Sequence, residues 1–405
     1  MCRTSRLGRA QAAIRFISIS AFAATIGLPA VAQTANEPIK IGTLFSMTGF
    51  GAVVGASSMT ALNMSLKDLN DAGGIMGRKV VVVSGDDQSD ATIAVGEAKR
   101  LAFREKVDFV FGPAFGSLAI ATVPVTTEAK IVQFTTAGAA ELTPAFGPYH
   151  FSNFSGVRAQ AEAMIDIATR DLGSKAPALL TDTSANSKGV VVEVKNVLAQ
   201  RGLKLFGEQA FEPRTPDMTP QILSLRAAKP DIILSVSGSG EDAGLILKTL
   251  KDVGWDVRVE SIALAFLSTA ALKVAGPEAF EKAIGVTFKA LTYCPSDALG
   301  ASDFARFVTR IETFAPELKG KLAAPNALFT ADQVSMVKAA VEATKSTDAA
   351  KISAWLEQSV GSVPTIMGKM QASKTEHIML SSGSFVGVVR PDQKRADGLL
   401  QRAGC

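Results

Sequence analysis

Short apolar runs alternate along this chain with longer stretches in which apolar residues recur every three or four positions. The first pattern is typical of a buried strand and the second of an amphipathic helix. Together they predict strands at 39–45, 79–84, 109–111 and 131–134, with helices at 57–69, 91–103 and 116–128. Strands that alternate with helices in this order predict a parallel sheet covered by helices on both faces.

The same alternation starts again after about residue 157. It predicts helices at 159–169, 188–200, 219–228 and 241–253, and strands at 176–181, 205–211, 231–236 and 257–262. We therefore expect an α/β fold with two similar arrays, about 38–156 and 157–287, and the length of 405 residues also favours two domains. The tail has helical stretches near 303–313, 331–344 and 349–358 and an apolar strand at 384–389, so it must pack on one array or cross between both.

The first 32 residues are typical of a secretory signal peptide. Four arginines and no acidic residue precede an apolar run at 16–28, which is too short to span a bilayer. The small residues Ala30 and Ala32 predict cleavage before Gln33, and therefore a periplasmic protein, although a short membrane anchor remains the alternative. Removal of this segment lowers the formal charge from +4 to zero, so the mature chain has no basic excess that would favour nucleic acid.

Most cofactor and metal motifs are missing or misspaced. The glycines at 49, 51 and 55 miss the dinucleotide fingerprint because Val54 stands where the third glycine belongs, and those at 238, 240 and 244 miss it in the same way. His150 and His377 are the two histidines, and the chain has no Gly-x-Ser-x-Gly motif. We expect no cofactor, no metal and no catalysis, while a catalytic site assembled by folding stays open. Cys294 and Cys405 remain after cleavage, and the sequence does not decide whether they pair.

Two loops follow neighbouring predicted strands. Gly112-Pro-Ala-Phe-Gly-Ser117 precedes a helix, and helix N-termini attract anions such as carboxylates; the alternative is that Ser117 is an ordinary N-cap. Thr135-Thr-Ala-Gly-Ala-Ala-Glu-Leu142 has small residues that would let a ligand approach the backbone. Because α/β folds bind ligands at the carboxyl ends of parallel strands, the two loops together predict a binding cleft.

Several segments in order resemble the type I periplasmic solute-binding proteins of ABC importers, the Leu/Ile/Val-binding family. The matching segments are Ile39-Lys-Ile-Gly-Thr-Leu-Phe-Ser-Met-Thr-Gly49, Asn70-Asp-Ala-Gly-Gly-Ile-Met-Gly-Arg78, Asp86-Asp87, Ala139-Ala-Glu-Leu-Thr143, Pro230-Asp-Ile-Ile-Leu234 and Glu376-His377. The resemblance covers essentially the whole mature chain. It implies two Rossmann-like lobes joined by a three-strand hinge, closure on a ligand, and docking onto a membrane permease. The implied lobes are 38–156 plus about 288–365, and 157–287 plus about 366–405.

The resemblance also implies ligand contacts. Ser117 matches the serine that holds the ligand carboxylate, and Thr136, Ala137 and Gly138 match the small and hydroxyl residues of the next loop. In the second lobe Asn186 matches a covering aromatic residue, Ser239 a polar or aromatic contact, and Leu264 the acid that pairs with an amino group. Val54 matches the aromatic residue of the first lobe. An apolar ligand body would lie against Phe50, Val54, Phe115, Leu264 and Phe266.

The missing acid affects the expected ligand, because a buried ammonium without a partner costs several kcal/mol. A carboxylate with an apolar or aromatic body is therefore favoured, unless Glu260 or Glu241 takes the role and restores amino-acid binding. We expect a monomeric solute-binding protein whose partners are a small molecule and a permease. A periplasmic sensor of the same fold and an exported Rossmann-type oxidoreductase are the alternatives; a permease and ATPase encoded beside the gene, or bound nicotinamide, would distinguish them.

Overall fold

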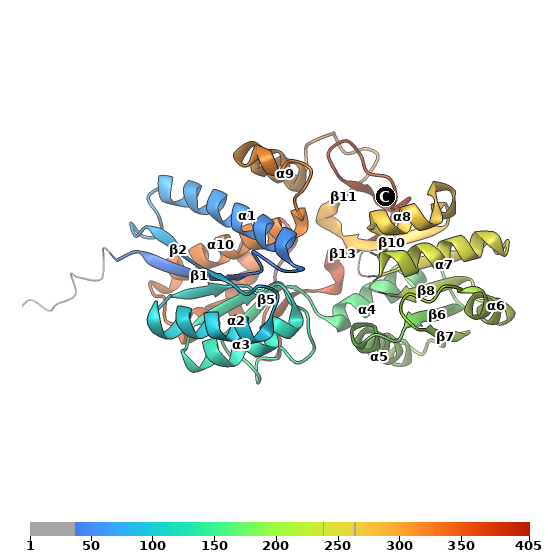
Figure 1. Cartoon of the computed structure of the whole chain (residues 1–405), viewed down its shortest axis with the longest axis horizontal. Coiled ribbons are helices and arrows are strands. Elements are labelled where there is room, and N and C mark those ends of the chain that lie inside the picture. Colours follow the sequence, from blue (N-terminus) through green and yellow to red (C-terminus); the bar gives the residue numbers. More distant parts are fainter. Residues whose placement is uncertain (1–36, 238, 263–264) are drawn as a thin grey trace, which may run out of the picture. The chain divides into compact units, whose positions relative to one another are not determined.

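The structure of this protein is a computed structural model that describes residues 37–405 apart from 238 and 263–264. The expected signal peptide, its cleavage site and Leu264 therefore lie outside the described residues. Two six-stranded sheets, each covered by helices on both faces, make up most of the described chain (Figure 1). The predicted α/β class is confirmed.

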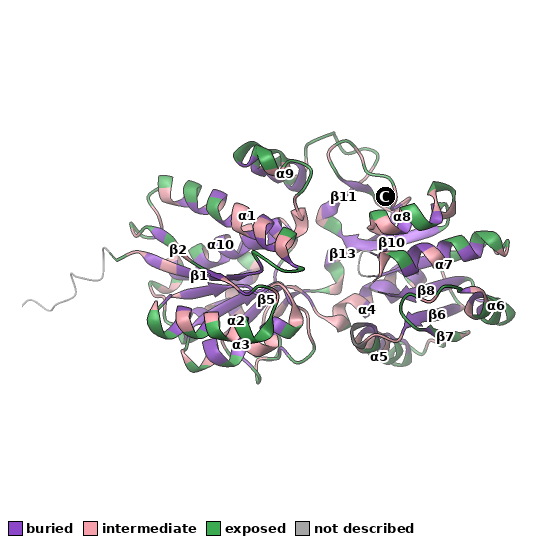
Figure 2. Cartoon of the chain, in the orientation of Figure 1, coloured by how far each residue is buried: buried purple, intermediate pink, exposed green. Residues whose placement is uncertain are grey.

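The first sheet is parallel throughout and has the strand order β12-β5-β4-β3-β1-β2. Its strands are β1 (Ile39–Phe45), β2 (Val80–Asp86), β3 (Phe109–Phe111), β4 (Val132–Thr135), β5 (His150–Ser155) and β12 (Ile378–Leu380). Successive side chains of a strand point to opposite faces, and in β3 this places Phe109 and Phe111 in one core cluster and Val110 in another. Most residues of these strands are buried, except in the edge strand β2 (Figure 2).

Helices α1 (Ala52–Asp71), α10 (Ala324–Thr344) and α11 (Ala349–Ser359) pack against the Phe109 face of this sheet. Helices α2 (Ala91–Lys99) and α3 (Gly116–Glu128) cover the other face. The helix α10 starts seven residues before the predicted position, with Pro325 in its first turn. Proline is well tolerated there, because the first N–H groups of a helix have no intrahelical partner.

The second sheet has the order β13-β10-β9-β8-β6-β7, and its first five strands along the chain repeat the order of the first sheet. Its strands are β6 (Pro177–Asp182), β7 (Glu208–Phe211), β8 (Ile232–Val236), β9 (Arg258–Ser261), β10 (Ala283–Phe288) and β13 (Phe385–Val389). Only β13 is antiparallel to its neighbour. The helices α4 (Val157–Asp166) and α5 (Ala185–Gln200) cover one face, and α6 (Thr219–Ala227), α7 (Gly240–Asp252) and α8 (Thr269–Ala275) cover the other.

Three passages join the sheets, as the resemblance implied. The chain leaves the first sheet after β5, returns after β10, and crosses again between β12 and β13. The tail was expected to leave the first lobe near residue 365, but Ile378–Leu380 still pairs with β5. The reason is packing: Met367, Met370 and Met379 join the core of the first sheet, and the Asp332 carboxylate of α10 accepts hydrogen bonds from the N–H groups of Ile366 and Met367.

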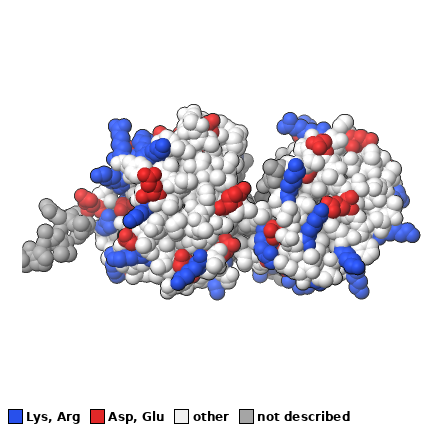
Figure 3. Space-filling model, turned by 90° about the horizontal axis from the view of Figure 1, so that it is seen from below, with Lys and Arg blue, Asp and Glu red and all other residues white. Residues whose placement is uncertain are grey.

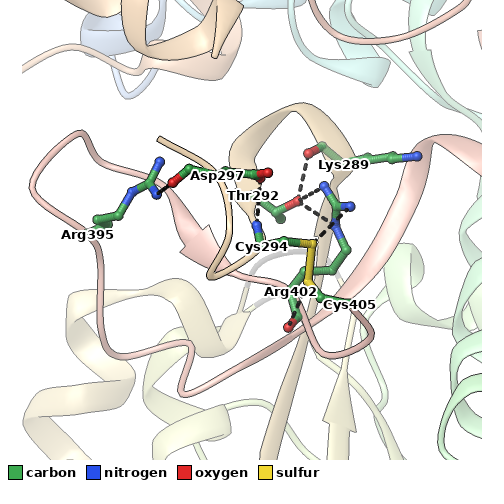
Figure 4. Close-up of a disulfide and its surroundings, with 7 residues drawn as sticks. All are labelled: Lys289, Thr292, Cys294, Asp297, Arg395, Arg402 and Cys405. Atoms are coloured by element: carbon green, nitrogen blue, oxygen red, sulfur yellow. Dashed lines mark hydrogen bonds between the residues drawn. A yellow bond between two sulfur atoms is a disulfide. The ribbon is translucent and has the colours of Figure 1, made fainter. Parts of the chain in front are cut away.

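A disulfide fastens the C-terminal end of the chain. Cys294 and Cys405 are bonded, with their Cα atoms 5.7 Å apart, next to the short parallel pair β11 (Thr292–Tyr293) and β14 (Leu400–Gln401) (Figure 4). The Arg402 guanidinium donates to the Thr292 hydroxyl at 3.0 Å. The Arg395 guanidinium lies 4.0 Å from the centre of the Tyr293 ring and pairs with Asp397. The pairing that the sequence left open is therefore present.

Loss of this disulfide should destabilise the protein. The two cysteines are 111 residues apart, so the cross-link restricts a large part of the unfolded chain and should contribute about 2–4 kcal/mol. A Cys294→Ala, Cys405→Ala double variant should unfold several degrees below the wild type in a thermal scan. The wild type in reductant is the control and should match the double variant; equal midpoints with and without reductant would contradict the prediction.

Two buried histidines attach β12 to the edge of the first sheet. The His150 side chain shares a 2.8 Å hydrogen bond with the Thr135 hydroxyl, while His377 stacks on Phe151 with ring centres 4.0 Å apart. The Nδ1 atom of His377 lies 2.9 Å from the His150 carbonyl oxygen, and its Nε2 atom lies 3.3 Å from Glu357. Burial, with a contribution from nearby His377, lowers the pKa of His150 to about 3. His150 is therefore neutral in the folded protein at neutral pH.

Acid should weaken the fold through His150. Between its ordinary pKa of 6.5 and its folded pKa of about 3, only the unfolded chain binds the proton. The free energy of unfolding should then fall by up to about 1.4 kcal/mol for each pH unit of acidification in this range. Urea unfolding of the wild type and of His150→Asn at pH 7 and pH 4 tests this. The variant should lose less stability than the wild type, and equal losses would show that His150 does not carry the effect.

Candidate functional site

The loops singled out in the sequence leave one edge of the first sheet. In its strand order, β1 lies between β2 and β3, so the connection after β1 runs to one side and the connections after β3 and β4 run to the other. Connections that diverge at such a switch point leave an opening above the carboxyl ends of the strands, where parallel α/β sheets bind ligands. The loops after β1, β3 and β4 begin at this edge.

The loop after β3 leads into the start of α3 without capping its N–H groups by a side chain. Gly112 has φ of +93°, and a Cβ atom there would lie 2.1 Å from the Leu44 carbonyl oxygen, so only glycine fits without a shift. The N-cap of α3 is Phe115, and no side chain caps the helix. Ser117 is therefore not the N-cap that the sequence left as an alternative; it is an exposed residue of the first turn. The uncapped N–H groups of this turn carry partial positive charge and suit an anion.

The loop after β4 lies close to the end of β5. Ala137 is buried, and Thr136 and Gly138 are half-buried. A Cβ atom on Gly138 would lie 2.1 Å from the Ser155 carbonyl oxygen. This position therefore needs glycine, and the close approach lets the loop run along the strand ends rather than project away from them.

These two loops line a cavity of about 370 Å³, a size typical of small-molecule sites. Phe115, Thr136, Ala137 and Gly138, four of the residues expected at the site, line it together. The sequence missed Phe154, Phe288 and Phe329, whose ring centres lie 5.5–5.7 Å apart. They come from β5, β10 and α10, and no local pattern marks residues that meet only after folding. Pro325 and Asn326 of the first turn of α10 complete this wall.

The loop after β1 places an aromatic residue beside the cavity. The Phe50 side chain is 75% exposed and its ring centre lies 4.8 Å from that of Phe115. Asp86 fixes this loop by accepting hydrogen bonds from Met47 and Thr48. Burial raises the pKa of the neighbouring Asp87, whose carboxylate accepts a 2.5 Å hydrogen bond from Ser46. The acidic pair therefore shapes the loop, and Val54 lies behind it, lining a smaller hollow.

The expected residues of the second lobe do not line this cavity. Ser239 caps α7, because its hydroxyl accepts a hydrogen bond from the N–H of Asp242. Asn186 lies in the first turn of α5, but its side chain, like Leu264, is outside the described part of the structure. The expectation for Phe266 is wrong: this side chain is 1% exposed and packs on Phe280 in the core of the second sheet.

Neither glutamate that might have replaced the missing acid lines the cavity. Glu260 is fully buried in β9, and both of its carboxyl oxygens lack a hydrogen-bond partner. Burial, reinforced by the charge of Asp171, raises its pKa well above the usual range, which favours the neutral carboxyl group. Glu241 is exposed in the first turn of α7. The lining of the cavity, as far as the structure describes it, contains no acidic side chain.

The described residues contain no cluster of three or more side chains suited to a metal ion. Over the same residues, no helix combines the length and apolar character needed to cross a bilayer. Basic and acidic side chains are interspersed on the face seen in Figure 3. The candidate site therefore offers a ligand an aromatic cavity with backbone N–H groups at one end.

Comparison with known proteins gives a family match over residues 38–394, to the model described as periplasmic binding protein. A Leu/Ile/Val-binding protein homolog 7 from Brucella abortus is 27% identical over 237 residues, which are 56% of this chain and 59% of the relative. The alignment thus spans about three fifths of that relative's length. The Leu/Ile/Val-binding protein BraC3 of Rhizobium johnstonii is 23% identical over 360 residues, which cover 88% of this chain and 92% of that one.

A solved structure supports the fold in particular. The branched-chain amino acid transporter substrate-binding protein LivJ from Streptococcus pneumoniae, in complex with isoleucine, superposes with a TM-score of 0.66. It shares 19% sequence identity, and the match covers 90% of this chain and 98% of that one. At this identity the similarity shows the fold alone.

Gly138→Ala should disrupt the cavity wall. The new Cβ atom would meet the Ser155 carbonyl oxygen at 2.1 Å, and relieving this overlap should cost about 1–3 kcal/mol of stability. The matched control is Gly96→Ala in α2, where a Cβ atom meets nothing within 4 Å and the gain in helix propensity should stabilise the protein by up to about 1 kcal/mol. The midpoint of thermal unfolding should fall for Gly138→Ala and rise for Gly96→Ala. Equal midpoints for the two variants would contradict the close approach of Gly138 to Ser155.

Proposed function

Because this chain belongs to the periplasmic binding protein family, we propose that it is the extracytoplasmic solute-binding component of an ABC importer. The ligand proposed for it is a small carboxylate with an apolar or aromatic body, branched-chain amino acids included. The observation that carries the proposal is the aromatic cavity beside an uncapped helix N-terminus at the carboxyl ends of β3 and β4. The names of the relatives, which refer to leucine, isoleucine and valine, support the size of the ligand.

The carboxylate would lie at the start of α3. Gly116 lines the cavity, and the N–H groups of this first turn have no side-chain cap. Ser117 is exposed one residue further along the same turn and is not among the residues that line the cavity. Backbone N–H groups at a helix N-terminus bind anions without a basic side chain, which fits a cavity lining in which the structure describes no lysine or arginine.

The apolar body would lie against the rings of Phe115, Phe154 and Phe329. These rings offer a wide apolar surface with few polar groups, the usual composition of a small-molecule pocket. No carboxylate among the described lining residues stands ready to pair with an ammonium group. An amino acid would therefore need another acceptor, whereas a carboxylate without the amino group needs none.

We further propose that the two sheets form the lobes of a hinged protein, and that Asn186, Ser239 and Leu264 contact the ligand when the lobes close. The three passages between the sheets support this arrangement. The ligand would stabilise the closed state through contacts that the open state lacks. The closed form would then dock onto the permease, after export of the chain by cleavage near Ala32.

Ser117→Ala should weaken carboxylate binding if the hydroxyl donates to the charged group. Loss of such a hydrogen bond costs about 1–3 kcal/mol, which is roughly a 5- to 150-fold rise in Kd. Calorimetry of the mature protein with leucine, 4-methylpentanoate and benzoate provides the measurement. Ser224→Ala, an exposed serine of α6, is the matched control and should bind as the wild type does. If the wild type binds none of these carboxylates, the proposed ligand class is wrong; an unchanged Kd in Ser117→Ala removes only Ser117 from the site.

A further inference from the structure

A buried glutamine has an unused acceptor next to the candidate site. Gln333 lies on α10 and is 1% exposed. Its Nε2 group donates to the Asn153 side-chain oxygen at 2.9 Å and lies 3.4 Å from the Thr135 carbonyl oxygen. Its Oε1 atom is buried and has no hydrogen-bond partner. A buried acceptor without a hydrogen-bond partner destabilises the fold by about 1–3 kcal/mol. A donor that reached Oε1 would remove this cost.

The orientation of the Gln333 amide is fixed by its neighbours. The Asn153 amide nitrogen donates to the Phe329 carbonyl oxygen at 2.7 Å, so the Asn153 oxygen is the atom that faces Gln333. A flipped Gln333 amide would place its own oxygen against that oxygen and the Thr135 carbonyl, which are both acceptors. The Nε2 group of Gln333 is therefore used in these two contacts, and Oε1 points away from Asn153 and Thr135.

Gln333 also lines a small hollow. It is lined by Gln333 together with Ser46, Val54, Ser58, Thr136 and Thr330. Its volume is about 10 Å³, which is close to the minimum for one water-sized group. Ala114 and Thr136 line both this hollow and the aromatic cavity, so the two spaces share a wall. The body of a ligand in the cavity would therefore lie beside the hollow.

We propose that this hollow is a subsite for a small hydrogen-bond donor of the ligand, a hydroxyl or an amino group, and that Gln333 Oε1 accepts its hydrogen bond. This inference rests on the proposed function and narrows its substrate class to carboxylates that carry such a donor. A neutral acceptor suits a hydroxyl without a charge penalty, and it also gives an ammonium a partner that the acid-free cavity lining lacks. Groups larger than a hydroxyl or an amine do not fit the volume.

The test compares ligands that differ in a single group. One series is leucine, 2-hydroxy-4-methylpentanoate, 4-methylpentanoate and 4-methyl-2-oxopentanoate, in which only the first two carry a donor beside the carboxylate. A second series, 4-hydroxybenzoate, benzoate and 4-fluorobenzoate, places the donor at the far end of the body. In at least one series, donor-bearing members should bind the wild-type mature protein about 5- to 10-fold more tightly than the others, as measured by calorimetry.

Gln333→Met keeps the volume and removes the acceptor, so it should reduce this preference to within about twofold. The matched control is Gln221→Met on α6, because the Oε1 atom of Gln221 is also buried without a partner; its preference should equal that of the wild type. A purely structural role of Gln333 would weaken all ligands alike and leave the preference intact, which would overturn the proposal.

The wild type alone supplies a second test that does not depend on the folding of a variant. Equal binding of all members within both series would overturn the subsite while leaving the proposed function standing. Binding of no member in either series would overturn both. A crystal structure with 2-hydroxy-4-methylpentanoate should place its hydroxyl within hydrogen-bond distance of Gln333 Oε1; a water molecule there, with the hydroxyl elsewhere, would show a hydration site instead.

Discussion

Both sheets place their first strand between the second and the third, and the candidate site depends on this hydrogen-bonded order. A parallel strand must be followed by a crossover, and the side on which the crossover runs is set by the neighbour with which the next strand pairs. In the first sheet the crossovers after β1 and β3 therefore run to opposite sides. The loops that begin at Ser46 and Gly112 diverge for the same reason, and Gly116 at the uncapped start of α3 lines the cavity.

The walls of the cavity are held by buried polar groups rather than by apolar packing alone. The strand β5 is almost fully buried although four of its six residues are polar: His150, Ser152, Asn153 and Ser155. Asn153 and Gln333 connect this strand to α10, and His150 connects it to Thr135 at the end of β4. Buried polar groups are costly unless they find partners, so these contacts fix the register of α10 against the sheet. That register places Phe329 opposite Phe154 in the cavity wall.

The polar chemistry of the cavity is uneven. At one end it has helix N–H groups that suit a negative charge, and the adjoining hollow is lined by Gln333, whose amide oxygen has no hydrogen-bond partner. The sequence offered Glu260 as a partner for an ammonium group. This glutamate is fully buried in the second sheet, and its pKa is raised. Selectivity between ligands would then come from hydrogen bonding and size, since an unpaired buried donor or acceptor discriminates more strongly than a methylene group.

The sequence by itself determined the α/β class, the two repeated arrays and the loops that flank the site. These follow from local causes: apolar runs, helical periodicity, and glycines that the backbone requires at positions such as Gly112 and Gly138. It missed β5, β10 and β12. The strand β5 buries four polar side chains and so has no apolar run, β10 is interrupted by Gly285 and Thr287, and β12 has three residues. Other features were decided by the tertiary structure alone. The segment up to Leu380 pairs with the first sheet, and Cys294 forms a disulfide with Cys405. The side chain of Phe266 packs in the core of the second sheet. It also decided that Gln333 ends beside the loop after β4, because a contact across 198 residues arises from packing between elements and leaves no periodic signal in the chain.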